Sequence, residues 1–95
     1  MYLHIGNGES IKTKDIIGIF DLDTSTVSKI TKKYISSKEK EGRVEYTDSD
    51  LPRAFIICGK DFKNEKVKLS RISSHGLVQR IRAEMKGYRN GKSED

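Results

Sequence analysis

The 95-residue chain has one cysteine, one proline, no tryptophan and only three phenylalanines and four tyrosines. A single cysteine, Cys58, excludes an intrachain disulfide, and its place in the apolar run Ala54–Cys58 predicts a buried, reduced thiol. No apolar stretch approaches the ~20 residues of a membrane span, and the apolar start is too short for a signal peptide. We therefore expect a cytoplasmic protein with no membrane partner.

Groups that converge on a reaction or a metal ion are also missing from the sequence. His4, His75 and Cys58 lack the paired short spacings of structural zinc sites. Gly6-Asn7-Gly8 lacks the third glycine and the Gly-Lys-Ser/Thr sequence of phosphate-binding loops. We expect no catalytic residue, no metal site, no cofactor and no small-molecule substrate, and hence a protein that is not an enzyme.

Positive charge is concentrated in the second half of the chain. Residues 1–50 hold eight Lys and Arg against nine Asp and Glu, whereas residues 51–95 hold eleven against five. A small domain does not need this imbalance in order to fold, so it suggests a polyanionic partner. A solubilising surface is the alternative interpretation, because charge alone does not define a function.

Three strands are predicted before residue 21. Leu3 and Ile5 alternate with polar residues and end in a Gly6-Asn7-Gly8 turn that needs positive φ angles. A second strand surrounds Ile11, and the apolar run at residues 16–20 is typical of a strand covered on both faces. We expect these segments to form a three-stranded meander.

Two helices are predicted, one in each half of the chain. The first follows the N-cap residue types Asp21, Asp23 and Thr24, carries an apolar stripe and stops at Gly42; the stripe is Val27, Ile30 and Tyr34. The second begins at Ser73 or Ser74 and ends at Gly87, with an apolar face of Leu77, Val78, Ile81 and Met85.

Strands at residues 43–47, 54–58 and 66–71 lie between the two helices, with a turn at residues 48–52. The predicted fold is α+β, a small antiparallel sheet with two helices. Residues 1–86 would form a single domain and residues 87–95 a disordered charged tail. The few aromatic residues leave a thin core, which favours burial of further apolar surface by self-association.

A standard helix-turn-helix is excluded, because about thirty residues of strand pattern separate the two helices. Recognition of a polyanion would use strands and loops, or one patch repeated around an oligomer. Binding of RNA or single-stranded DNA is less favoured, because most aromatic residues occupy apolar positions.

Four segments are distinctive when taken together: residues 5–8, the strand at residues 16–19, the Arg53-Ala54 pair, and Leu69-Ser70 followed by Ile72, Leu77, Arg80 and Ile81. They resemble the RemA/RemB extracellular-matrix regulators of Gram-positive bacteria. The resemblance covers residues 1 to about 83, and Ser73-Ser74 together with the acidic turn is more similar to the RemB branch. It implies a subunit of a ring-shaped homo-oligomer that binds double-stranded DNA and activates biofilm-matrix genes.

The DNA-binding residues predicted from the resemblance and the charge pattern are all cations: Lys12, Lys14, Arg53, Lys66 and Lys68. The basic turn of RemA-like members falls on residues 48–53, where Asp48 and Asp50 replace arginines, and a second basic position falls on Asp15. These carboxylates would repel phosphate. The alternative is therefore a non-enzymatic interaction module that assembles with a RemA-like paralogue and contacts DNA weakly or not at all.

Overall fold

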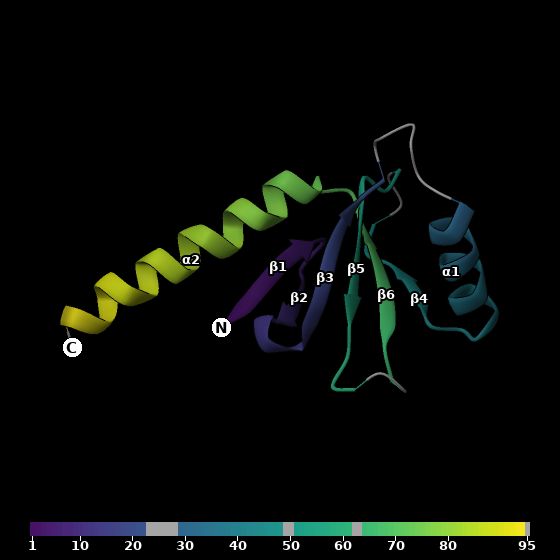
Figure 1. Ribbon diagram of the computed structural model, residues 1–95. Helices are drawn as coiled ribbons and strands as arrows, with labels where there is room; N and C mark the ends of the chain where they lie inside the picture. The colour runs from purple at the N-terminus through teal and green to yellow at the C-terminus, as the bar shows by residue number, and fades with distance from the viewer. Residues whose placement is uncertain (23–28, 49–50, 62–63, 95) are drawn as a thin grey trace.

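The structure is a computed structural model that describes residues 1–22, 29–48, 51–61 and 64–94 (Figure 1). Its elements in chain order are β1 (Tyr2–Gly6), β2 (Glu9–Lys12), the 3-10 helix η1 (Thr13–Asp15), β3 (Ile16–Asp21), α1 (Lys29–Lys40), β4 (Val44–Tyr46), β5 (Ala54–Cys58), β6 (Lys66–Ser70) and α2 (Ser74–Glu94). This confirms the α+β class and the two helices.

Strands β1 and β2 form an antiparallel hairpin that is a two-stranded sheet by itself. The turn between them has positive φ at Gly6, Asn7 and Gly8, as the sequence predicted. Glycine and asparagine are the residues that adopt such angles most readily. The predicted meander is wrong, because β3 pairs with β5 in a second sheet and not with the hairpin.

The second sheet has four strands in the order β3-β5-β6-β4. The β3–β5 and β5–β6 pairs are antiparallel, but β4 lies parallel to β6, with Val44 opposite Val67 and Tyr46 opposite Leu69. The sheet is therefore mixed, which corrects the prediction of a purely antiparallel one. Alternation along residues 43–47 predicted a strand but contained no information on its partner or direction.

The four-stranded sheet is covered on both faces (Figure 1). The β1–β2 hairpin and the start of α2 pack on one face, where the buried residues are Leu3, Ile5, Ile11, Ala54, Ile56, Cys58 and Leu77. Helix α1 lies on the other face, over a cluster of Phe55, Val67 and Leu69. Cys58 is 6% exposed, which confirms its predicted burial.

Helix α1 stops where the sequence predicted. Gly42 has a φ of +73°, and the N–H groups of Gly42 and Arg43 donate to the carbonyls of Glu39 and Lys38. This pair of bonds is a Schellman motif, which satisfies carbonyls at the helix end. Asp21 belongs to β3 and is therefore not the N-cap of α1, while Asp23, Thr24 and Val27 lie outside the described residues. Ile30 is 80% exposed, so the predicted apolar stripe is wrong at that position.

Helix α2 begins as predicted and ends later. The Ser73 hydroxyl accepts a hydrogen bond of 3.1 Å from the Gly76 N–H, which makes Ser73 the N-cap. Leu77 is fully buried, but the helix continues past Gly87 to Glu94 and away from the sheets (Figure 1). The predicted helix end at Gly87 is wrong, because a glycine weakens a helix by ~1 kcal/mol without removing a backbone donor. The disordered charged tail expected at residues 87–95 stays a prediction.

Candidate functional site

The five cations predicted to bind DNA lie at two ends of the four-stranded sheet. Lys12 and Lys14 flank the start of η1, and Lys66 and Lys68 begin β6, so these four lysines are at the end where β5 finishes. Arg53 precedes β5 at the opposite end, where its N–H donates to the Ser70 carbonyl. Cys58 is five positions after Arg53, a span of about 17 Å at the usual strand rise. Arg53 is thus not part of one continuous patch with the lysines.

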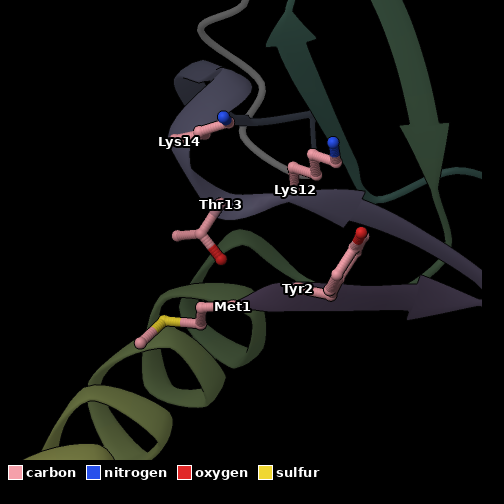
Figure 2. Close-up of a pocket in the computed structure, with 5 residues that line it drawn as sticks. All are labelled: Met1, Tyr2, Lys12, Thr13 and Lys14. Carbon is pink, nitrogen blue, oxygen red and sulfur yellow. The ribbon is translucent and has the colours of Figure 1, made fainter.

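A small hollow of about 460 Å³ lies beside the hairpin and η1 (Figure 2). Its lining residues are Met1, Tyr2, Lys12, Thr13 and Lys14. The Thr13 N–H donates to the Met1 carbonyl at 3.0 Å, which fixes η1 against the start of β1. The Thr13 hydroxyl oxygen is buried, and it has no hydrogen-bond partner in the described part of the chain.

A larger hollow of about 590 Å³ lies between β2, η1 and the β5–β6 connection. It brings together Lys12, Lys66 and Lys68 from the predicted set and adds Lys60, which was not predicted. Asp15 and Asp61 also line it. Lys60 belongs to the basic second half of the chain, but it follows the strand, so no alternation pattern placed it on this surface.

Hydrogen bonds connect described residues on both sides of the β5–β6 connection beside the larger hollow. The Gly59 N–H donates to the Asp15 carbonyl at 2.9 Å, and an added Cβ at Gly59 would lie 2.9 Å from the Asn64 carbonyl oxygen. Only glycine allows this close approach. The Asp61 carboxylate accepts bonds from the Asn64 N–H and side-chain amide at 3.0 Å. These bonds hold the backbone at Gly59 and Asn64, which are close in sequence to Lys60 and Lys66.

Lys68 differs from the other lysines because carboxylates surround it. Its ammonium group lies 2.6 Å from Glu45 Oε1 and 3.4 Å from Glu9 Oε1. Burial lowers the pKa of Lys68, but the hydrogen bond and charge of Glu45, with a contribution from Glu9, raise it more. The Lys68 hydrogen bond in turn holds the pKa of Glu45 below its usual range. The charge of Lys68 is already compensated within the protein.

The other cations differ in how closely carboxylates approach them. Lys66 is 3.8 Å from Glu45, a loose contact for a side chain that is 55% exposed. In the described part of the chain, no carboxylate forms an ion pair with Lys12, Lys14 or Lys60, all of which are exposed. We call Lys12, Lys14, Lys60 and Lys66 the lysine cluster.

The opposite end of the sheet has a more balanced charge. Asp48 Oδ2 lies 3.0 Å from Arg71 Nε, and Asp50 lies outside the described residues. Asp48, which falls where the resembled family has a basic residue, is thus paired with the cation Arg71, which directly follows β6.

The titratable and nucleophilic groups named in the sequence analysis do not converge. Burial raises the pKa of the Cys58 thiol, which disfavours the reactive thiolate. His4 and His75 are both exposed. Among the described residues, no group of three or more His, Cys, Asp or Glu could hold a metal ion. Nor does any described helix have the length and apolarity to span a membrane.

These observations define a small α+β domain with a lysine-rich end and two open hollows. Residues 2–81 match the RemA-like family, whose description is extracellular matrix regulatory protein A-like. The match covers more than four fifths of the chain, and the chain belongs to this family of matrix regulators. A comparison with curated proteins gave no match. The part of α2 beyond Ile81 lies outside the matched residues.

Proposed function

We propose that this protein is a cytoplasmic, DNA-binding regulator of extracellular-matrix genes, of the RemB-like branch, and that it assembles into a ring. The family supports a role in matrix regulation. The observation that carries DNA binding is the lysine cluster, in which Lys12, Lys14 and Lys60 are exposed and form no ion pair with a described carboxylate. Lysine ammonium groups with this exposure are available to phosphate oxygens.

Phosphate contacts from these lysines would position the protein on the duplex without reading bases. Within the described parts of the chain, neither α1 nor α2 is joined to another helix by a short turn, so these elements do not form a helix-turn-helix. Sequence preference would come from the shape and bending of DNA. Lys68 would contribute little, because Glu45 and Glu9 compensate its charge, while Arg53 at the other end of β5 would contact a separate phosphate.

Self-association is supported by apolar side chains at the surface. Among the described residues, the large apolar side chains that are at least 44% exposed are Met1, Tyr2, Ile17, Phe20, Ile30, Tyr46, Leu51 and Met85. Strands β3 and β4 are the two edges of the four-stranded sheet, so their outer backbone groups face away from β5 and β6. A ring needs different surfaces on its two sides, and repetition of a modest basic patch would raise affinity by avidity.

A mobility-shift titration at several salt concentrations tests DNA binding. With about six phosphates neutralised in each contacting unit, affinity should fall by roughly 10³ between 50 and 200 mM salt. Light scattering with and without a promoter fragment tests the assembly in the same samples. A flat salt profile, or a monomer at micromolar concentration that duplex DNA does not change, would contradict the proposal.

Two lysine pairs locate the DNA surface. Lys12→Ala with Lys14→Ala should weaken binding uniformly across DNA sequences and make the salt dependence shallower. Lys32→Ala with Lys33→Ala is the matched control, because these exposed lysines lie on α1 at the other face of the sheet. If the variant with Lys12→Ala and Lys14→Ala no longer forms the oligomer and no longer binds DNA, these residues join subunits and do not bind phosphate.

The second candidate is an interaction module that works with a DNA-binding, RemA-like paralogue. Asp48 in the turn, the substitution at Asp15 and the compensated charge of Lys68 favour it. It predicts co-purification with the paralogue and no shift of promoter DNA by this chain alone. Tight DNA binding that persists without the paralogue would exclude it.

A further inference from the structure

An exposed tyrosine lies at the edge of the larger hollow, beside Lys12 and Lys60, which form no ion pair with a described carboxylate, and Lys66, which has only a loose contact of 3.8 Å with Glu45. We propose that this hollow binds a nucleoside polyphosphate as a ligand, with the base stacked on Tyr2 and the phosphates held by Lys12, Lys60 and Lys66. The inference does not rest on DNA binding or on ring assembly. It assigns a small-molecule site to a chain whose sequence predicted no small-molecule substrate.

The hollow has the size and the walls of a ligand site. Its volume of about 590 Å³ falls within the ~300–1,000 Å³ that is typical of small-molecule pockets. The described part of the wall is held in place by the bonds of Gly59 to Asp15 and of Asn64 to Asp61. A preformed site loses less free energy to ordering when the ligand binds.

The charges of the hollow favour an anion of limited extent. Lys12, Lys60 and Lys66 come from two separate segments, and they repel one another until an anion lies between them. Lys68 is already paired with carboxylates and leaves the phosphates to the other three lysines. Asp15 and Asp61 also line the hollow, which interrupts the basic surface. This confined positive charge suits a discrete polyphosphate.

Tyr2 provides the surface for a base. Its side chain is 55% exposed and lies outside the two described core clusters, although most large apolar residues of the strands contribute to them. Tyr2 is the cross-strand neighbour of Lys12, and Figure 2 shows the two side chains pointing to the same side of the hairpin. An exposed aromatic ring beside cations is the usual arrangement for stacking a base while phosphates are neutralised.

Calorimetric titration without magnesium tests the site with three probes: ATP, inorganic tripolyphosphate and adenosine. We expect ATP to bind most tightly, tripolyphosphate more weakly and adenosine least. Lys60→Gln with Lys66→Gln should raise the Kd for ATP by about tenfold or more. Tyr2→Leu should raise the Kd for ATP by about tenfold and leave that for tripolyphosphate unchanged.

Lys32→Gln with Lys33→Gln is the charge-matched control, and it should change the Kd for ATP less than about twofold, since these exposed lysines lie on α1 at the other face of the sheet, and salt screens exposed charges. An equal loss of affinity for ATP in the Lys60/Lys66 variant and the Lys32/Lys33 variant would mean non-specific attraction and would overturn the proposal. An absence of ATP binding would also overturn the proposal, as would an effect of Tyr2→Leu that is equal for ATP and tripolyphosphate. A fourth probe, single-stranded oligothymidine, should be displaced by ATP if it binds at all, and binding that ATP does not displace would overturn the proposal. Because these titrations contain no duplex, their failure is separate from failure of the promoter mobility shift.

Discussion

The two faces of the four-stranded sheet are packed very differently. On the face covered by the β1–β2 hairpin and α2, seven residues form a buried cluster, and the covering elements themselves contribute Leu3, Ile5, Ile11 and Leu77. On the face covered by α1, three residues are buried, all of them on the sheet, and α1 contributes no buried residue. The hydrophobic stabilisation of the fold is therefore concentrated on the hairpin face.

Polar contacts compensate in part for the thin packing of α1. Tyr34 donates a hydrogen bond of 2.7 Å to Glu65, and Lys38 lies 3.4 Å from the same carboxylate. Burial, the hydrogen bond and the charge of Glu65 raise the pKa of Tyr34, so the phenol keeps its proton. Because hydrogen bonds and partly exposed ion pairs contribute less than a well-packed apolar side chain, α1 is held more weakly than the hairpin.

The largest expected effect comes from truncating the apolar anchor of α2. Leu77→Ala should lower the free energy of unfolding by about 3 kcal/mol, because Leu77 is fully buried and the substitution leaves a cavity. Ile35→Ala on α1 is the matched comparison and should cost about 1 kcal/mol, because Ile35 is only partly buried. Urea unfolding measures both. Equal losses would contradict the difference between the two faces.

A smaller effect is expected from the polar link between the hairpin and the sheet. The buried Ser70 hydroxyl donates to the Ile5 carbonyl at 2.7 Å and accepts from the Ile72 N–H at 3.0 Å. Ser70→Ala leaves both backbone groups without this partner and should cost about 2 kcal/mol. Amide exchange of the hairpin should accelerate in the variant. If exchange accelerates only in α1, the hairpin does not depend on this hydroxyl.

Removal of the hydroxyl of Tyr34 sharpens the comparison on the α1 side. Tyr34→Phe should lower the free energy of unfolding by about 1 kcal/mol, because one hydrogen bond to a charged group is lost while the ring remains. Amide exchange within α1 should accelerate more than exchange in β1 and β2. A uniform change in both regions would mean that the helix and the hairpin open together.

The smallest expected effect is a pH dependence that originates from Glu45. Its pKa is lowered in the folded protein by the Lys68 hydrogen bond, so its contribution is present above the unfolded value near 4.5 and is lost as pH falls through the folded pKa. The contribution should stay below about 1 kcal/mol, because Glu45 is 44% exposed. Glu45→Gln should flatten acid unfolding below pH 4.5. Glu39→Gln on α1 is the control, and an equal change there would exclude a specific role of Glu45.

Local features of the fold were predictable because short-range chemistry determines them. The Gly6-Asn7-Gly8 turn, the Ser73 cap, the stop at Gly42 and the buried strand at β5 follow from backbone preferences and from apolar runs. The pairing of β4 with β6 and the separation of the hairpin from β3 were not predictable in this way. They depend on contacts between residues that are distant in the chain, and alternation along one strand does not identify its neighbour.

The candidate site was predicted in part for the same reason. The strand pattern placed Lys66 and Lys68 on one side of β6, and the structure adds Lys12 to the same hollow. The strand pattern did not reveal that Glu45, on the adjacent strand, and Glu9, on the hairpin, surround Lys68. Nor did it identify Lys60, which enters the hollow through the conformation of Gly59 in the β5–β6 connection.

The docking of β1 and β2 has a consequence for biosynthesis. The Ile5 carbonyl accepts a hydrogen bond from Ser70 and the His4 carbonyl accepts one from Arg80, so β1 needs partners that the ribosome makes 65 and 76 residues later. Contacts this distant in sequence slow folding, because a long loop must close before they form. Until α2 leaves the exit tunnel, the nascent chain exposes the apolar surface that the hairpin later covers, which is the interval when a chaperone has the most to shield.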